Sequence, residues 1–202
     1  MMSSRRFRAA AAIALAVAAL NTAAAAGEAA QPDDMTLGNP NAKVTVVEYA
    51  SASCPHCAHF NNAVFPAFKA KYIDTGRVHF VFREFLTPPA EVASAGFLIA
   101  RCAGKDKYFS VLDTFFRGQE KMYETGDIRG ALAHAAGSAG MTEGQYEACL
   151  SDPAALKALD ARIERNAKRD DVQYTPTFII NGKKMDTEAT LANLDAAIAA
   201  AH

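Results

Sequence analysis

The feature that most constrains this chain is the motif Cys54-Pro55-His56-Cys57, which follows an apolar, β-branched stretch at residues 44–49. A strand that ends where a helix begins places Cys54 at the helix N-terminus, where unpaired N–H groups and the helix macrodipole favour negative charge. Pro55 suits the first helical position because its φ angle is already helical. A protonated His56 would add a nearby positive charge. We therefore predict that Cys54 is a thiolate at neutral pH.

Two cysteines three residues apart at a helix start can close a small, reactive disulfide, and we favour this redox-active interpretation. A structural disulfide is one alternative. The other is a protein that binds copper or zinc through Cys54, His56 and Cys57, with His59 as a further ligand. A structural zinc site takes four ligands, and no second cysteine or histidine pair follows along the chain, so we expect no metal.

Residues 1–26 have the pattern of an export signal peptide. Three arginines precede an apolar run of 12 residues, and Ala24-Ala25-Ala26 fits a small-residue cleavage site. The run is too short to span a bilayer, although an uncleaved anchor is the alternative. The pair Arg5-Arg6 also suggests a twin-arginine signal, which the residues after it fit poorly.

Cleavage after Ala26 would remove three of the 21 basic residues and none of the 22 acidic ones, which leaves a net charge of −4. No basic patch suggests a nucleic-acid partner. Export leads to an oxidising compartment, where disulfides persist. The remaining chain, about 176 residues, suits one compact unit or one domain with an insertion.

Apolar periodicity predicts the elements in turn. Residues 44–49 form a buried central strand, residues 57–72 a helix that Pro66 kinks, and residues 78–82 a second strand parallel to the first. Asn181-Gly182 predicts a hairpin, and residues 187–201 a closing helix. The pattern between the two halves is helical over residues 89–170, with breaks expected at Gly104, Gly118, Gly126, Gly137 and Gly140.

The C-P-H-C motif, the preceding V-V-E-Y strand with Glu48, and Tyr174-Thr175-Pro176-Thr177 together resemble the DsbA-like thiol:disulfide oxidoreductases of the thioredoxin superfamily. More narrowly, the chain is similar to the branch with a second cysteine pair that occurs in some Gram-negative bacteria. The resemblance covers about residues 35–200.

The fold that this resemblance implies is α/β, a thioredoxin-like fold with an inserted helical domain. We expect a flexible leader and first short strand at residues 27–43. The thioredoxin-like domain then occupies residues 44–88 and 171–202, and the inserted helical domain lies between its two parts at residues 89–170.

The resemblance also implies roles for residues outside the motif. Glu48 would lie beneath the active site and assist proton movement to Cys57; the alternative is that its side chain reaches solvent at the sheet edge. Pro176 would be cis and lie against the two cysteines. Thr175 would then offer its backbone to an extended substrate chain.

The chain has two further cysteines, Cys102 and Cys149, and four cysteines allow three connectivities. The C-x-x-C chemistry requires Cys54 and Cys57 to pair with each other, which leaves a Cys102–Cys149 disulfide. We expect its role to be structural. The alternative at the level of the family is that it tunes the reduction potential of the active pair.

The expected function is that of a monomeric periplasmic enzyme that introduces disulfides into unfolded or partly folded exported proteins. The resemblance implies no bound cofactor and a membrane, quinone-linked re-oxidant of the DsbB kind. A disulfide isomerase or reductase is the main alternative. Known isomerases of this type carry an added dimerisation domain, for which the short segment between Gly27 and Val44 leaves no room.

Overall fold

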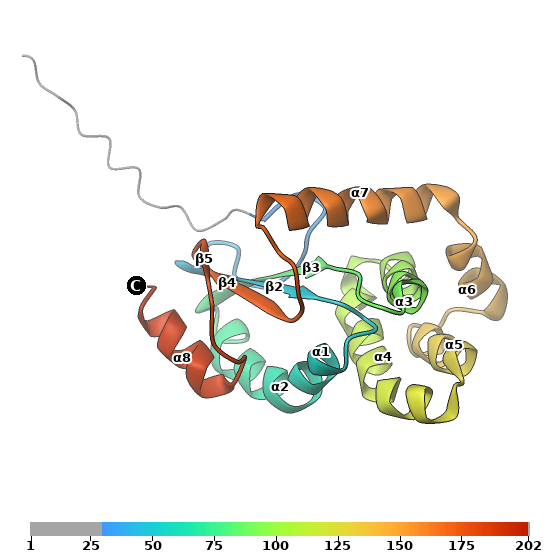
Figure 1. Cartoon of the computed structure of the whole chain (residues 1–202), viewed down its shortest axis with the longest axis horizontal. Coiled ribbons are helices and arrows are strands. Elements are labelled where there is room, and N and C mark those ends of the chain that lie inside the picture. Colours follow the sequence, from blue (N-terminus) through green and yellow to red (C-terminus); the bar gives the residue numbers. More distant parts are fainter. Residues whose placement is uncertain (1–29, 202) are drawn as a thin grey trace, which may run out of the picture.

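The computed structural model describes residues 30–201, so the predicted signal peptide lies outside the described residues. They form a sheet with helices on both faces and a further group of helices beyond one end (Figure 1). The strands lie in the order β1-β3-β2-β4-β5. Their bounds are Met35–Gly38 (β1), Val44–Ala50 (β2), Val78–Glu84 (β3), Thr177–Ile180 (β4) and Lys183–Lys184 (β5).

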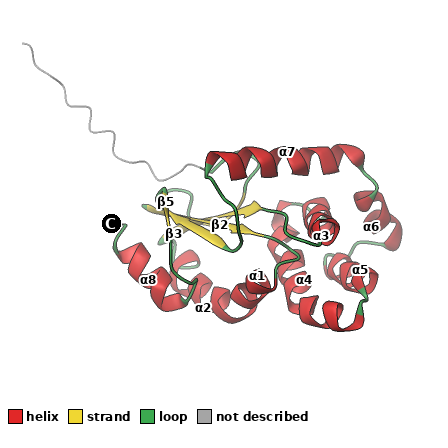
Figure 2. Cartoon of the chain, viewed as in Figure 1, coloured by secondary structure: helices red, strands yellow, loops and turns green. Residues whose placement is uncertain are grey.

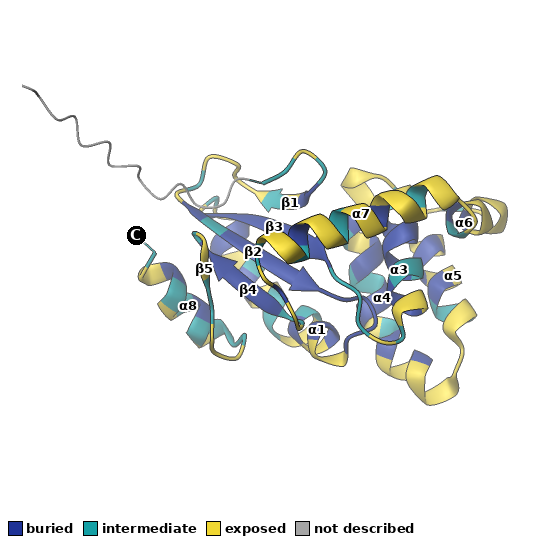
Figure 3. Cartoon of the chain, turned by 45° about the horizontal axis from the view of Figure 1, so that its top comes forward, coloured by how far each residue is buried: buried dark blue, intermediate teal, exposed yellow. Residues whose placement is uncertain are grey.

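Strand β2 lies at the centre of this sheet (Figure 2). It runs parallel to β3, as predicted, and antiparallel to β4. Every residue of β2 except Thr45 is buried (Figure 3). Its side chains alternate between the two faces, as in any strand. Val46 and Ala50 join the main core, whereas Val47 and Tyr49 join a smaller cluster on the opposite face, which helix α7 covers.

The segment after the cysteine motif is helical but irregular. It consists of α1 (Pro55–His59), a π-helical turn η1 (Phe60–Val64), α2 (Phe65–Phe68) and a second π-helical turn η2 (Lys69–Ile73). The single kink predicted at Pro66 is thus spread over two π turns, since proline removes a backbone donor and its neighbours rearrange around it. Apolar residues at helical spacing give the segment one inward face, on which Phe60, Phe68 and Tyr72 are buried and Val64 is half-buried.

Five helices lie between β3 and β4. Their bounds are Ala90–Cys102 (α3), Lys105–Thr125 (α4), Ile128–Ser138 (α5), Glu143–Leu150 (α6) and Pro153–Arg169 (α7). Gly104, Gly126 and Gly140 have positive φ angles and lie between helices, as predicted. The breaks predicted at Gly118 and Gly137 are wrong, because both residues lie inside helices. A single helical glycine costs only about 1 kcal/mol, which tertiary packing offsets.

The C-terminal part contains the predicted hairpin and a shorter closing helix than expected. Asn181 and Gly182 have φ angles of 47° and 79° and join β4 to β5. Helix α8 (Leu191–Ala199) begins four residues after the predicted start, because the Thr190 side chain caps it by accepting a hydrogen bond from the backbone N–H of Asn193. The residues just before Thr190 therefore lie outside the helix and line a groove beside the cysteines.

A buried ion-pair network holds the leader against the face that α7 covers. Arg83 on β3 is fully buried and pairs with Asp34 at 3.0 Å and with Asp170 at 2.8 Å. Asp33 pairs with Arg165 of α7 at 2.9 Å. The last residues of the expected flexible leader are therefore anchored to the fold, by contacts with partners that lie far away in the sequence.

We expect Arg83→Ala to lower the free energy of unfolding by about 3–5 kcal/mol, because Asp34 and Asp170 both lose a buried counter-charge and, within the described residues, only Asp170 retains another, from Arg169. Urea denaturation monitored by circular dichroism measures this change. Arg129→Ala is the matched control: Arg129 also pairs with two carboxylates, but its side chain is 68% exposed, and we expect a loss below about 1 kcal/mol. Equal losses for the two variants would show that burial of the Arg83 network contributes nothing.

Candidate active site

Cys54 and Cys57 lie where β2 passes into α1, as the motif predicts. Cys54 is the N-cap of α1 in an extended conformation, and Pro55 occupies its first turn. Both cysteines carry free thiols in this structure. The side chain of Cys57 is fully buried, whereas Cys54 retains 7% exposure, so the two sulfur atoms differ in their access to a large reactant.

The surroundings of Cys54 lower its pKa to about 5. The largest cause is a hydrogen bond from the Cys57 thiol; burial opposes it, and the Thr175 side chain and the backbone N–H groups of Cys57 and His56 add to it. His56 therefore acts through its backbone, while its exposed side chain, expected to supply a charge, lies outside these contacts. Burial and the nearby Cys54 sulfur raise the pKa of Cys57.

The loop before Cys54 is held by two polar side chains of the inserted helix α4. The Nε2 group of Gln119 donates to the carbonyl oxygen of Ala52 at 2.8 Å, and the Tyr123 hydroxyl donates to the carbonyl oxygen of Ser53 at 2.8 Å. Neither residue was singled out from the sequence, because their role depends on contacts across more than 60 positions. The sequence offers one signal for Gln119: its spacing places it on the apolar face of the helix, where a polar side chain needs a hydrogen-bond partner.

The proline loop closes the other side of the site. The Thr175–Pro176 peptide bond is cis, as the resemblance implies. The Cys54 thiol lies 3.5 Å from the carbonyl oxygen of Thr175. The Thr175 hydroxyl is buried and has no oxygen or nitrogen partner among the described residues, so the Cys54 sulfur is the group that it can serve.

Glu48 is buried in the central strand, on the same face as the main core. The alternative of a solvent-exposed side chain at the sheet edge is therefore wrong, since β2 has strands on both sides and Glu48 is only 4% exposed. Burial, with a smaller effect of Cys54, raises its pKa to about 8. Glu48 lines a cavity of about 360 Å³ walled by the aromatic side chains Phe65, Phe80, Phe82, Phe109 and Phe116. The carboxyl group is thus protonated near neutral pH and close to the site.

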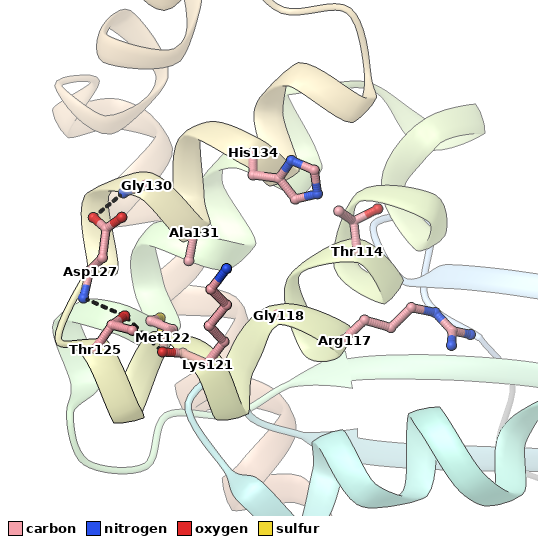
Figure 4. A pocket seen from close by; sticks show the side chains of 10 residues that line it. All are labelled: Thr114, Arg117, Gly118, Lys121, Met122, Thr125, Asp127, Gly130, Ala131 and His134. Carbon is pink, nitrogen blue, oxygen red and sulfur yellow. Dashed lines mark hydrogen bonds between the residues drawn. The ribbon is translucent and has the colours of Figure 1, made fainter.

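A groove of about 490 Å³ adjoins the cysteines, and its lining includes His56 of the motif and Thr175, which contacts the Cys54 sulfur. Its walls are the exposed side of α1, the residues around Pro176 and the segment before α8. A larger cavity, about 650 Å³, lies between α4 and α5, where the side chains of Lys121 and His134 point into it (Figure 4). That cavity includes no residue of the cysteine site, so we assign the candidate site to the groove.

The remaining cysteines form a disulfide, Cys102–Cys149, between the end of α3 and helix α6, with Cα atoms 6.1 Å apart. Within residues 30–201, no group of three or more His, Cys, Asp or Glu side chains is arranged to hold a metal ion. None of the helices in this part of the chain is long and apolar enough to cross a membrane.

The chain matches the family model described as thioredoxin over residues 30–200. A curated relative from Rickettsia bellii, named a putative protein-disulfide oxidoreductase, is 35% identical over 151 residues, which are 74% of this chain. The chain spans 58% of the length of that relative. Disulfide bond formation protein D of Bacillus subtilis is 26% identical over 79% of this chain and 73% of its own length.

Among solved structures, the fold is similar to that of Wolbachia pipientis alpha-DsbA1. The TM-score is 0.76 at 24% identity, and the match covers 85% of this chain and 92% of that one. The thioredoxin-like α/β fold with inserted helices, which the motif and the proline loop predict, is therefore confirmed.

We expect Thr175→Val to raise the pKa of Cys54 to about 6, because it removes one hydrogen bond to the thiolate and keeps the side-chain shape. Titration of the thiolate by its ultraviolet absorbance, in protein whose second disulfide is intact, measures the change. Thr187→Val, at an exposed position in the same part of the chain, is the matched control and should leave the titration unchanged. An unaltered pKa in Thr175→Val would remove the hydroxyl from the set of stabilising contacts.

The stability of the reduced protein should depend on pH in a defined direction. The pKa of Cys54 is lowered in the folded state, so the thiolate contributes stability above the ordinary cysteine pKa of about 9 and loses it as pH falls through about 5. Glu48 titrates in the opposite sense but is present in both redox forms, so it largely cancels when they are compared. Urea melts of reduced and oxidised protein at pH 8 and pH 4.5 should show the reduced form losing relative stability at the lower pH. The same difference at both pH values would mean that no stabilised thiolate exists.

Proposed function

This chain belongs to the thioredoxin family, and on that basis we propose that it is a protein thiol:disulfide oxidoreductase of the DsbA type, which gives its Cys54–Cys57 disulfide to exported proteins. The observation that carries the proposal is the asymmetry of the two cysteines. Cys54 is at a helix start with a pKa near 5, and Cys57 is buried behind it with a raised pKa. The Cys54 sulfur can thus be attacked by a substrate and can later leave as a thiolate, while the Cys57 sulfur is shielded from substrates.

In the proposed reaction, a thiolate of the substrate attacks the sulfur of Cys54 in the oxidised protein. The Cys54–Cys57 bond breaks, and Cys57 leaves with the bonding electrons. A second thiolate of the substrate then attacks the substrate sulfur of the mixed disulfide, and Cys54 leaves as a thiolate. The substrate loses two electrons and two protons. The protein takes up both electrons and one proton, on Cys57, while Cys54 remains a thiolate and the second proton passes to solvent.

Glu48 is suited to supply the proton that the departing Cys57 requires. Burial is the main cause of its raised pKa of about 8, which keeps it protonated near neutral pH. Cys57 has a raised pKa and is therefore a strong proton acceptor once it carries charge. We propose that the carboxyl group of Glu48 protonates Cys57 and is itself re-protonated through the adjoining cavity.

The properties of Cys54 favour oxidation of substrates over the reverse direction. A thiol of low pKa is a good leaving group, so the mixed disulfide resolves toward oxidised substrate and reduced protein. Thr175 would align the substrate by offering its backbone beside the Cys54 sulfur, which it already contacts at 3.5 Å. A disulfide isomerase or reductase would use the same residues and differ in being kept reduced in the cell.

We propose a periplasmic location, on the basis of the predicted signal peptide, and a membrane, quinone-linked re-oxidant of the DsbB kind. For the Cys102–Cys149 disulfide we propose a structural role, because it joins two helices of the insertion and lies outside the cysteine loop. Its sequence separation of 47 residues corresponds to a stabilisation of about 4 kcal/mol on the chain-entropy account.

We expect Cys57→Ser to accumulate mixed disulfides with exported proteins in cells. The Cys54 thiolate can still attack a disulfide that an exported protein already holds, and the Cys57 thiol that would release it again is absent. Non-reducing electrophoresis followed by mass spectrometry of the trapped species measures this. Cys54→Ser is the matched control and should trap none. If Cys57→Ser traps no more protein than Cys54→Ser does, Cys54 is not the sulfur that substrates meet.

A further inference from the structure

The groove beside Cys54 has an apolar floor. Phe60 and Phe178 pack edge to face there, with ring centroids 4.7 Å apart, and Val64 and Met185 extend the same surface. An apolar floor holds many side chains without distinguishing among them, since hydrophobic contact is non-directional. Discrimination between substrates must therefore come from the rim.

The rim carries unpaired negative charge. Asp186 and Glu188 line the groove, are exposed, and form no ion pair with any residue that the structure describes. The lining includes no lysine or arginine; its only other ionisable side chains are two histidines on α1 and the hydroxyl of Tyr174. The groove is thus acidic on the side opposite the cysteine motif.

The two carboxylates differ in their neighbours. Asp186 also lines a second cavity, which it shares with Lys183 and Lys184 of β5. Of these, Lys184 donates to the backbone carbonyl of Asp171 at 2.7 Å. Glu188 lines the groove but not this second cavity, and the groove contains no lysine. Glu188 should therefore contribute the larger part of the negative potential.

An exposed aromatic ring completes the rim. The Tyr174 side chain is 56% exposed, immediately before the Thr175 that contacts the Cys54 sulfur. A lysine or arginine over an aromatic face is attracted by about 0.5–1 kcal/mol at exposed sites. The carboxylates and the ring thus favour the same kind of partner.

We propose that this groove selects substrate segments that carry lysine or arginine close to the reactive cysteine, and disfavours acidic ones. The inference deepens the proposed function and rests on it, since it concerns the substrates of the Cys54–Cys57 disulfide. The occupant is an extended, cationic segment of an unfolded protein, whose apolar side chains lie on the groove floor while its basic side chain meets Glu188, Asp186 and Tyr174.

The test compares three model peptides, each with one reactive cysteine pair, that differ only in having lysine, glutamine or glutamate beside the first cysteine. The rate constant kcat/KM for their oxidation by the oxidised protein is measured at one pH and low salt. We expect the lysine peptide to react about fivefold faster than the glutamate peptide, a ratio in keeping with contacts of this strength. At 1 M salt the Debye length is about 3 Å, and the ratio should approach one.

Variants then locate the source of the preference. Glu188→Gln should reduce the lysine-to-glutamate ratio more than Asp186→Asn does, and the double variant should bring it below about twofold. Asp160→Asn is the matched control, because it removes one exposed charge from α7, on the opposite face of the sheet, and should preserve the ratio. Each ratio is taken on a single variant, so a general loss of activity does not affect it.

The possible failures are distinguishable. Equal rates for the three wild-type peptides, or a preference that the double variant retains, would overturn the acidic-rim inference and leave the proposed function intact. No oxidation of any peptide by the wild-type protein would overturn the proposed function itself.

Discussion

The hydrogen bond from the Cys57 thiol to the Cys54 sulfur is the interaction on which the site depends, because it is the largest influence that lowers the pKa of Cys54. This hydrogen bond requires the Cys54 sulfur at the exposed N-terminus of a helix. It also requires the Cys57 sulfur one helical turn later, on the buried side. Strand β2 and Pro55 set the first position, and the core sets the second. The surrounding loops, from both halves of the chain, complete the burial of Cys57.

Local rules predict the part of the site that lies within one short segment. The strand-to-helix transition at Cys54 and the Asn181-Gly182 turn follow from neighbouring residues, and both are present. The burial of Glu48 follows from its place in an apolar strand. Contacts across long sequence separations could not be predicted. Examples are the hydrogen bonds from Gln119 and Tyr123 to the loop before Cys54, and the ion pair between Asp34 and Arg83. The π-helical turns around Pro66 were also missed, since periodicity does not distinguish them from a kinked helix.

Buried carboxyl groups at the sheet are stabilised in two ways, by pairing with arginine or by protonation. On the α7 face, Arg83 and two aspartates compensate one another, so charge is retained and the leader is anchored. On the opposite face, Glu48 has no hydrogen bond within the described residues, and its raised pKa leaves it neutral instead. A paired charge resists titration and serves stability, whereas an unpaired carboxyl group near pH 7 can exchange a proton, which suits the chemistry proposed for that face.

The contacts of α4 with the cysteine loop have an electrostatic consequence. The carbonyl groups of Ala52 and Ser53 carry partial negative charge next to a sulfur that is itself negative when reduced, and two such dipoles would oppose its ionisation. Gln119 and Tyr123 donate hydrogen bonds to these same oxygens and so neutralise part of that repulsion. The inserted helix α4 thus favours the ionised form of Cys54. A chain that lacked this helix would have a Cys54 thiol of higher pKa.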